Sequence, residues 1–576
     1  MSPAPGIKPA SSTSSSSHLR VAPTSRRVAN IIVDTLRELG VTNYFGIPGG
    51  AISPIYDALM DTPGVRVLHN RHETGALFMA AGCSLLGKTP CVLVTSGPGL
   101  TNAITGLASA FADSVPLVVI GGEVARKNFG RGALQEGSKY ELDLQAMVRS
   151  VTKYSATIMN PRSAAAVVRR AVGTALSGRR GPVFLSLPID VASESVVPSV
   201  SSSQVSTSFV LDEQLVERAA KALMTARKGL ILVGSGARHP MAVTQVRILA
   251  EMLQMPVATT PKGKGLFPER NQLSLGVFGY GGHLSANSYI QAAPDVILAI
   301  GCGLGETATN SWNPTLQPTG TFIQIDIDGS QIGKNYHVDL GLVGAAHQVL
   351  PSIISRLRSR PMGPTGSRIV YHAPEDALEE RPVLHPARVM SLLQQCFPTD
   401  TIFTSDIGEH LMFALHYLKV DMPDGFLAGI GLGSMGSGIG MAVGAKYASP
   451  ERPVVSICGD YGFQMFGMEL NTCVQYNIGV VFAVLNDGRM RMVEAGFERV
   501  YGRHLSVDGP AVDFAALASA HGAVGVVIRT AEDFAKLGPE VFQGVKPVVL
   551  DIRTDPGVMF ANDGRNQQLS NFTGKG

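Results

Sequence analysis

Short apolar runs alternate with longer amphipathic stretches along most of the chain. The runs at 454–458 and 480–485 are continuous and rich in β-branched residues, a composition typical of strands buried on both faces of a parallel sheet. Further strand-like runs lie at 66–69, 90–95, 117–121, 229–233 and 296–300. The alternation of such strands with helical stretches predicts an α/β fold built from doubly wound parallel sheets.

Two polar stretches divide the chain into three such blocks. Residues 199–208 consist of Ser, Val, Gln and Thr, and residues 359–380 contain three prolines. With 576 residues, the chain is long enough for several domains. The predicted divisions are a disordered tail at 1–26, domains at 27–197, 211–357 and 385–555, and a C-terminal tail at 556–576.

Composition narrows the class of protein. Hydrophobic residues make up 45% of the chain and charged residues 16%, as in a well-buried globular enzyme. The formal net charge of +3 is too small to indicate a nucleic-acid partner, and no apolar run reaches the roughly 18–20 residues that span a membrane. The six cysteines form no CxxC pair, so reduced core thiols are predicted, and neither disulfides nor a zinc site.

The N-terminal segment has a composition of its own. Its first 33 residues contain no acidic residue and are rich in Ser, Pro and Arg. This favours a disordered tail, with an organelle transit peptide as the alternative. A cytoplasmic location is therefore predicted, or an organellar one if the tail is a transit peptide.

Polar residues follow both of the clearest strands. Gly459 permits a tight turn, and Asp460 then stands at the carboxyl end of its strand, where open α/β sheets bind ligands. A helix predicted at 465–476 offers its N-terminal amides to an anion. Asn486 and Asp487 reach the same sheet edge after the second strand. Oxygen ligands of this kind, with phosphate oxygens and water, make up a normal magnesium shell. The pattern therefore predicts a diphosphate held through a divalent cation, with a capped strand-end turn as the structural alternative.

This segment resembles the thiamine diphosphate motif, which opens with GDG or GDA and closes with Asn-Asn after a second strand. Four further segments are similar to signatures of thiamine-diphosphate-dependent enzymes. They are FGIPGGA at 45–51, HETGA at 72–76, TSGPGLTN at 95–102 and GLGSMG at 431–436. The resemblance covers 27–551 and is strongest to the large subunit of acetolactate (acetohydroxyacid) synthases.

The resemblance implies a fold and an activity. The three predicted domains would be the pyrimidine-binding, central and diphosphate-binding domains, and the cofactors would be thiamine diphosphate and Mg²⁺. The enzyme would decarboxylate pyruvate and transfer the two-carbon acyl unit to a second 2-keto acid or another carbonyl acceptor. A non-carboligating pyruvate decarboxylase or oxidase and a catalytically silent paralogue are the alternatives. FAD and a regulatory subunit stay open.

The resemblance also implies roles for single residues. Glu73 would hydrogen-bond the N1′ atom of the cofactor pyrimidine, Met435 would impose the bent cofactor conformation, and Gln135 is a third catalytic position. A helix-capping Glu73 and a core Met435 are the structural alternatives. In relatives, Glu73 of one chain and the diphosphate site of another complete each active centre, which implies a homodimer or homotetramer. The implied metal ligands are Asp460, Asp487 and the carbonyl oxygen of Arg489. The implied cofactor-binding residues are Gly50, Glu73, Pro98, Asn102, Gly408, Glu409, His410, Gly433, Met435, Gly459, Asp460, Tyr461, Gly462, Asp487, Met490, Met492 and Val493.

Five positions depart from the pattern of the synthases. Asp487 replaces the usual Asn, and Tyr461 replaces a small residue, so its side chain must point away from the diphosphate. Leu304 stands where an Arg normally contacts the acceptor carboxylate, and Gly496 stands where a Trp favours 2-ketobutyrate. Arg491 occurs where relatives often have Gly; a substitute contact to substrate or a solvent-facing side chain are its two interpretations. The donor half of the site therefore looks intact, and the acceptor half is altered.

Overall fold

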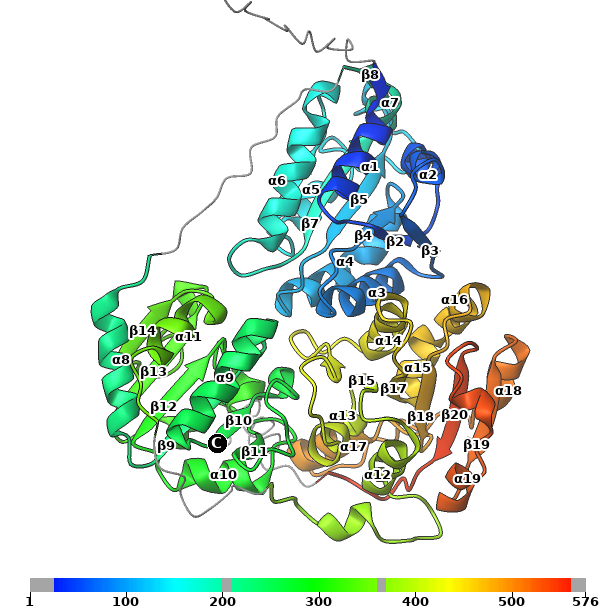
Figure 1. The fold of residues 1–576 in the computed structure, drawn as a ribbon. Helices are drawn as coiled ribbons and strands as arrows, with labels where there is room; N and C mark the ends of the chain where they lie inside the picture. Colours follow the sequence, from blue (N-terminus) through cyan, green and yellow to red (C-terminus); the bar gives the residue numbers. More distant parts are fainter. Residues whose placement is uncertain (1–24, 198–209, 360–368, 561–576) are drawn as a thin grey trace, which may run out of the picture.

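Three six-stranded parallel sheets, each flanked by helices, make up the protein (Figure 1). The structure is a computed structural model that describes residues 25–197, 210–359 and 369–560. The sheets follow one another along the chain, which confirms the predicted α/β fold with three doubly wound parallel sheets. The predicted tail at 1–26 lies outside the described residues except for its last two, and the tail at 556–576 is described only as far as 560.

The first and third sheets have the same strand order. The first runs β3-β2-β4-β5-β7-β6 and the third β16-β15-β17-β18-β20-β19. In each, the order reverses between the first strand of the sheet and the third, which creates a topological switch point. The first sheet contains β2 (Asn43–Gly46), β3 (Arg66–His69), β4 (Cys91–Val94), β5 (Val118–Glu123), β6 (Tyr154–Thr157) and β7 (Val183–Pro188). The third contains β15 (Ile402–Ser405), β16 (Phe426–Ala428), β17 (Val454–Gly459), β18 (Val481–Asn486), β19 (Val524–Ile528) and β20 (Val548–Arg553).

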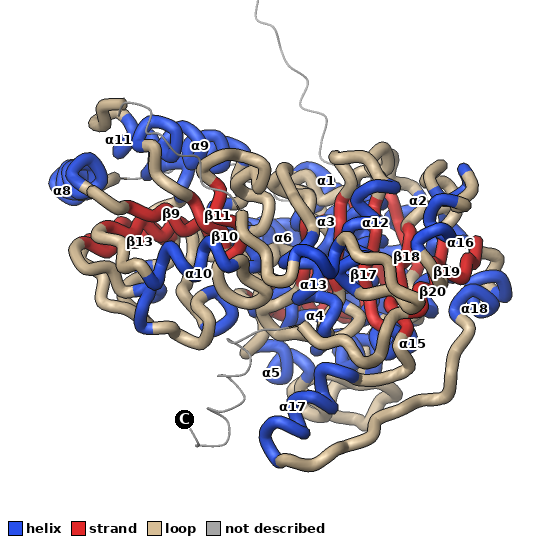
Figure 2. Tube along the Cα trace, turned by 90° about the horizontal axis from the view of Figure 1, so that it is seen from below, coloured by secondary structure: helices blue, strands red, loops and turns tan. Residues whose placement is uncertain are grey.

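The second sheet has a different order, β11-β10-β9-β12-β13-β14, which is that of dinucleotide-binding folds. Figure 2 shows its strands at the left of the view, apart from β17, β18 and β20 at the right. A short antiparallel pair, β1 (Arg26–Arg27) with β8 (Ser195–Val196), joins the start of the first unit to its end. The second sheet contains β9 (Gly229–Val233), β10 (Val257–Thr259), β11 (Ser274–Val277), β12 (Val296–Ile300), β13 (Thr321–Asp326) and β14 (Leu340–Val343).

Helices flank all three sheets. Around the first sheet lie α1 (Val28–Glu38), α2 (Ser53–Met60), α3 (Glu73–Leu85), α4 (Pro98–Ala112), α5 (Leu144–Arg149), α6 (Ala164–Leu176) and α7 (Ile189–Ser193). Around the second lie α8 (Glu213–Thr225), α9 (Pro240–Leu253), α10 (Leu284–Gln291) and α11 (Ala346–Ile354). Around the third lie α12 (Pro386–Cys396), α13 (Glu409–Tyr417), α14 (Ser437–Ala448), α15 (Asp460–Phe466), α16 (Leu470–Tyr476), α17 (Arg491–Tyr501), α18 (Phe514–Ala520) and α19 (Ala531–Ala535).

The first and third units share one apolar core, built around α3 and α14, which lie side by side in Figure 1. Glycines allow these helices to approach closely. A Cβ atom on Gly82 would lie 2.1 Å from the carbonyl oxygen of Met441, and one on Gly444 would lie 1.8 Å from that of Met79. Because neither backbone can move aside cheaply, small residues are required at both points. This contact fixes the start of α3, where Glu73 lies, relative to the third unit.

A buried ion pair joins the second unit to the third. Lys264 Nζ lies 2.6 Å from Glu269 Oε1, and both side chains are almost fully buried. The ammonium also donates to the carbonyl oxygen of Leu415, and the second oxygen of Glu269 accepts from the backbone N–H of Val420. Burial lowers the pKa of Lys264 and raises that of Glu269, and the mutual attraction of the two charges opposes both shifts. Each charge is therefore compensated by its partner and by the backbone of the other unit.

One predicted element is wrong. The helix expected at 465–476 begins earlier, at Asp460, and is interrupted by a 3₁₀ turn at Gly467–Glu469 before α16. The side chain of Glu469 is buried and accepts from the backbone N–H groups of Arg71 and His72 in the first unit. This tertiary contact, together with the weak helix propensity of Gly467, explains the break.

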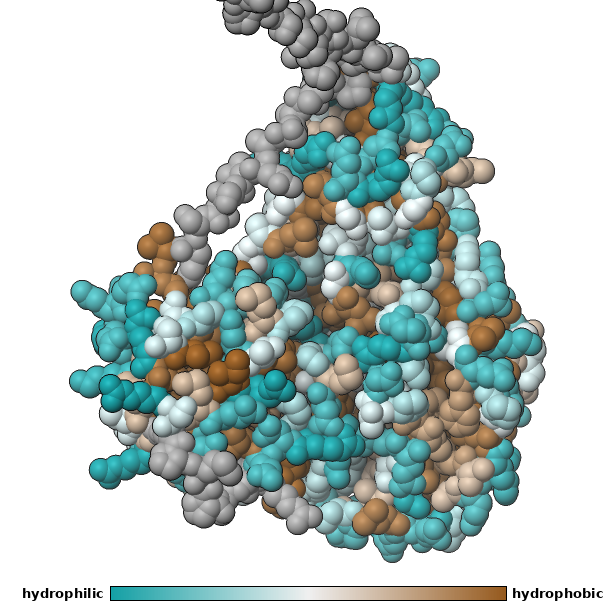
Figure 3. All heavy atoms as spheres, in the orientation of Figure 1, coloured by the Kyte–Doolittle hydropathy of each residue, from teal (hydrophilic) through white to brown (hydrophobic). Residues whose placement is uncertain are grey.

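No helix within the described ranges is long and apolar enough to cross a membrane. On the face drawn in Figure 3, apolar side chains form separate small patches among hydrophilic ones. Such scattered patches are normal on a folded protein.

Candidate active site

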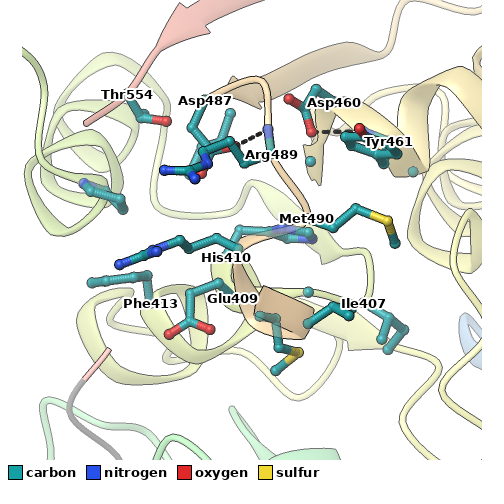
Figure 4. Close-up of a pocket in the computed structure, with 18 of the residues that line it drawn as sticks. Ile407, Glu409, His410, Phe413, Asp460, Tyr461, Asp487, Arg489, Met490 and Thr554 are labelled. Carbon is teal, nitrogen blue, oxygen red and sulfur yellow. Dashed lines mark hydrogen bonds between the residues drawn. The ribbon is translucent and has the colours of Figure 1, made fainter. Parts of the chain in front are cut away.

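The carboxyl ends of β15, β17 and β18 surround a cavity of about 270 Å³ in the third unit (Figure 4). β15 and β17 pair where the strand order reverses, the place at which open parallel sheets bind ligands. Every residue beyond 400 that the resemblance implies as a cofactor or metal ligand lines this cavity, whereas Asn486 does not and donates instead to Asp551 and to the carbonyl oxygen of Val512. The implied ligands that line it are Gly408, Glu409, His410, Gly433, Met435, Gly459, Asp460, Tyr461, Gly462, Asp487, Arg489, Met490, Met492 and Val493.

Two carboxylates lie at one edge of the cavity. Asp460 accepts from the backbone N–H of Tyr461 at 2.7 Å and from that of Gly488 at 2.8 Å. Asp487 accepts from the backbone N–H of Arg489 at 3.1 Å. Burial, together with the charge of Asp460, raises the pKa of Asp487 to about 7. Carboxylates that disfavour each other's charge in this way are well suited to share a cation.

A residue of the cavity wall also carries a buried nitrogen atom without a protein partner. His410 lines the cavity, and its Nε2 atom is buried and has no hydrogen-bond partner among the residues that the structure describes. Burial lowers the pKa of His410 to about 4. Gly462 also lines the cavity, and a Cβ atom there would lie 2.2 Å from Oδ2 of Asp406, so the close packing against Asp406 requires glycine. A cavity with paired carboxylates and a partnerless imidazole nitrogen fits a metal-bound diphosphate.

Asp406 holds the loop that carries Gly433 and Met435. It directly follows β15, and its carboxylate accepts from the backbone N–H of Gly436 at 2.9 Å and from that of Gly438 at 3.2 Å. Burial raises the pKa of Asp406 to about 6, although both hydrogen bonds favour the ionised form. The two bonds position the loop so that Met435 reaches the cavity.

Sequence reasoning missed Asp406, although a signal was present. It follows the buried strand β15 just as Asp460 follows β17. Only Asp460 belongs to a motif with a known signature, so only Asp460 was found. The lining after β20 was also missed. Thr554 and Asp555 directly follow that strand but belong to no motif, and Val558 lies in the predicted C-terminal tail, where the sequence does not indicate which residues reach the site.

The predicted residues of the first unit form a separate group. Glu73 starts α3 and is largely buried, and Asn102 donates from Nδ2 to its Oε2 at 3.1 Å. Gln135 adopts a positive φ of 63°, and its carbonyl oxygen accepts from the hydroxyl of Ser96 at 2.6 Å. Gly50 begins a short 3₁₀ turn, and Pro98 is the first residue of α4. Within the described chain, all residues that line the cavity lie beyond 385, so this group does not reach it.

The three positions that the resemblance associates with the acceptor lie in two different units. Leu304 is only 2% exposed and packs in the core of the second unit beside Cys302 and Phe322. Gly496 is buried in α17. Arg491 does not face solvent: its side chain is 19% exposed and lines the cavity. The solvent-facing interpretation of Arg491 is therefore wrong.

Tyr461 is among the residues that line the cavity, and its side chain reaches the loop after α17. There its hydroxyl donates to the carbonyl oxygen of Val507 at 2.8 Å. The hydroxyl is thus engaged by the loop after α17.

Within the described residues no group of three or more His, Cys, Asp or Glu side chains is arranged to hold a metal ion. Any cation at Asp460 and Asp487 would therefore need backbone, phosphate or water oxygens as well.

Comparison with known families gives three matches along the chain. Residues 26–147 match "Thiamine pyrophosphate enzyme, N-terminal TPP binding domain". Residues 216–353 match the central domain of the same enzymes. Residues 406–552 match their C-terminal TPP binding domain.

Individual proteins are similar over almost the whole length. A probable acetolactate synthase large subunit of Methanocaldococcus jannaschii is 34% identical over 550 residues, covering 92% of both chains. The acetolactate synthase isozyme 3 large subunit of Escherichia coli is 34% identical over 558 residues, covering 92% of this chain and 94% of its own. Among solved structures, the thiamine diphosphate-dependent 4-hydroxybenzoylformate decarboxylase of Rhodococcus jostii RHA1 superposes with a TM-score of 0.82. It covers 92% of this chain and 99% of its own, and its identity of 23% makes this a likeness of fold alone.

Proposed function

The chain belongs to the thiamine pyrophosphate enzyme family, and from that premise we propose that it is a carboligase of the acetolactate synthase type. It decarboxylates pyruvate and transfers the two-carbon acyl unit to a second 2-keto acid or another carbonyl acceptor. The observation that carries the proposal is the similarity to acetolactate synthase large subunits over 92% of the chain. Retention of Glu73, Asp460 and Met435 argues against a catalytically silent relative.

The residues of the cavity suit thiamine diphosphate and Mg²⁺. Asp460, Asp487 and the carbonyl oxygen of Arg489 would hold the metal, and the partnerless Nε2 of His410 would meet the diphosphate. Thiamine diphosphate supplies the electron sink that decarboxylation requires. Glu73 would keep a proton at the pyrimidine N1′ atom. Met435, which lines the cavity, would impose the bent cofactor conformation.

A complete active centre needs two chains in this proposal. Glu73 and Gln135 lie in the first unit and do not line the cavity of their own chain. A homodimer or homotetramer in which the first unit of one subunit covers the cavity of its partner would unite both groups. FAD and a regulatory subunit are not required for these steps.

Product analysis with pyruvate as the sole substrate tests the proposal. A carboligase gives acetolactate, a decarboxylase gives acetaldehyde, an oxidase gives acetate, and a silent protein gives nothing. Acetolactate is the expected product. Acetaldehyde or acetate as the main product would replace the proposal by the corresponding alternative.

The altered acceptor half predicts a loose choice of acceptor. Gly496 removes the aromatic wall associated with 2-ketobutyrate, and a lost hydrophobic wall costs about 1–3 kcal/mol of discrimination, or roughly 10–200-fold. We therefore expect little preference for 2-ketobutyrate when it competes with pyruvate for one donor pool. A strong excess of the 2-ketobutyrate product would contradict this part of the proposal.

A further inference from the structure

Arg491 has hydrogen-bonding capacity that the protein itself does not use. It is the first residue of α17 and lines the cavity between Met490 and Met492. Its Nε atom is buried and has no hydrogen-bond partner within the described residues. Its ion pair with Glu494 is long, with 3.7 Å between Nη1 and Oε2. A guanidinium carries five N–H donors in a planar fork, so most of this capacity remains for a ligand.

Glu494 pairs with Arg491 but does not occupy all of the hydrogen-bond donors of its guanidinium. This carboxylate is buried, and its Oε2 also lies 3.2 Å from Nε of Arg489, which pairs with Asp508 as well. Oε2 makes no hydrogen bond to any described residue, so neither contact is a well-aligned one. A buried guanidinium with an ion pair but few hydrogen bonds gains from a planar anion that can accept two of them.

Arg491 lines the same cavity as Asp460, Asp487 and His410, the residues that suit a metal-bound diphosphate. Its charge is close enough to Asp487 to oppose the rise of that residue's pKa. Arg491 also begins the helix that carries Gly496, the position that the resemblance associates with acceptor choice. No arginine occurs at 301–307, where the synthases have their carboxylate contact, and Leu304 there is buried in another unit.

We propose that Arg491 binds the carboxylate of the acceptor 2-keto acid. This inference rests on the proposed function, because it assumes a 2-keto acid at this site. It assigns the missing carboxylate contact to a residue of α17 in the third unit and removes the need for an arginine in the second unit. The substrate carboxylate would accept two hydrogen bonds from the guanidinium. The ion pair with Glu494 would hold the guanidinium in position.

Oxamate tests the inference, because it is an isostere of pyruvate that is not decarboxylated. Its neutral methyl ester serves as the reference ligand. Binding of both would be measured by calorimetry on the protein loaded with thiamine diphosphate and Mg²⁺. Arg491→Ala should weaken oxamate binding by about 10- to 100-fold, the usual effect of losing a charge-assisted hydrogen bond. Binding of the ester and affinity for the cofactor should change by less than about two-fold.

Two further variants sharpen the test. Arg491→Lys keeps the charge but loses the planar fork, so its oxamate affinity should lie between wild type and Arg491→Ala. Arg499→Ala removes the same charge from the exposed end of the same helix, about 12 Å further along, and should have no effect.

Each contrary result has its own meaning. Loss of thiamine diphosphate affinity in parallel with oxamate would place Arg491 at the diphosphate and overturn the inference. Equal weakening of oxamate and its ester, unchanged oxamate binding, or no oxamate binding by the wild type would overturn it too. If oxamate binds through Arg491 but pyruvate yields no acetolactate, the carboligase function fails and the carboxylate contact stands.

Discussion

Glu73 is the residue on which turnover should depend most. Its side chain is fixed by the hydrogen bond from Asn102, so Glu73→Gln keeps the shape of the group and removes its acidity. The cofactor C2 proton should exchange roughly 10²–10⁴-fold more slowly in this variant. Hydrogen–deuterium exchange at C2 measures this rate without any substrate. Cofactor binding should persist in the variant. Exchange at the wild-type rate would exclude the catalytic role.

The two carboxylates at the edge of the cavity should differ in importance. Asp460→Ala removes a proposed metal ligand, which also accepts from the backbone N–H of Gly488, so magnesium-dependent retention of thiamine diphosphate should be lost. Asp487→Asn restores the residue usual in the synthases and should be tolerated. Equilibrium dialysis with and without Mg²⁺ measures the retention of thiamine diphosphate by both variants. An inactive but folded Asp487→Asn protein would show that the extra charge has a function of its own.

Asp406 should make stability depend on pH. Its pKa of about 6 lies above its ordinary value of 3.8, so between these values the native state binds more protons than the unfolded state. Its contribution to stability is therefore fully present below about pH 4 and is lost as pH rises through about 6.

The variant Asp406→Asn isolates this contribution, because Asn does not titrate. In cofactor-free protein, the free energy of unfolding of wild type relative to the variant should fall by about 2–3 kcal/mol between pH 4 and pH 7. Urea unfolding at several pH values measures it. A difference that does not change with pH would show that the Asp406 carboxyl group is not perturbed.

At the scale of elements, the contact between α3 and α14 should tolerate no added volume. Gly82→Ala would force a methyl group against the carbonyl oxygen of Met441, and overpacking of this kind costs about 1–3 kcal/mol or more. Gly173→Ala in α6 is the matched control, because nothing lies within 4 Å of its added Cβ. It should stabilise by up to about 1 kcal/mol. Thermal unfolding measures both substitutions. Equal changes in melting temperature for Gly82→Ala and Gly173→Ala would contradict the close packing of α3 against α14.

The sequence predicted strands better than helix boundaries. Continuous apolar runs placed β17 and β18 within a residue, because strands buried on both faces leave little freedom of interpretation. The break between α15 and α16 was not predictable, because it depends on Glu469 reaching backbone N–H groups of another unit. The same limit applies to the site. Motifs predicted Asp460 and Met435 as cofactor-binding residues, whereas the partial burial of Arg491 follows from tertiary packing alone.

At the scale of the whole molecule, activity should require assembly. The cavity and Glu73 belong to different units and do not meet within the described chain. Two centres completed across a two-fold axis would bury a large, mostly apolar interface. Sedimentation velocity combined with activity over a dilution series should show activity only in dimers or larger species. A fully active monomer would exclude shared active centres.

The buried pair of Lys264 and Glu269 constrains how this protein can diverge. Replacing either residue alone leaves an uncompensated charge between two units, at a cost of about 3–5 kcal/mol, which is a large part of the stability of an ordinary domain. Replacing both with apolar residues of similar volume can be neutral. During evolution the pair can therefore be replaced only through a strongly destabilised single variant or by substitution of both residues at once. The ancestry of the two positions should show them kept together or lost together, with very few single-step descendants.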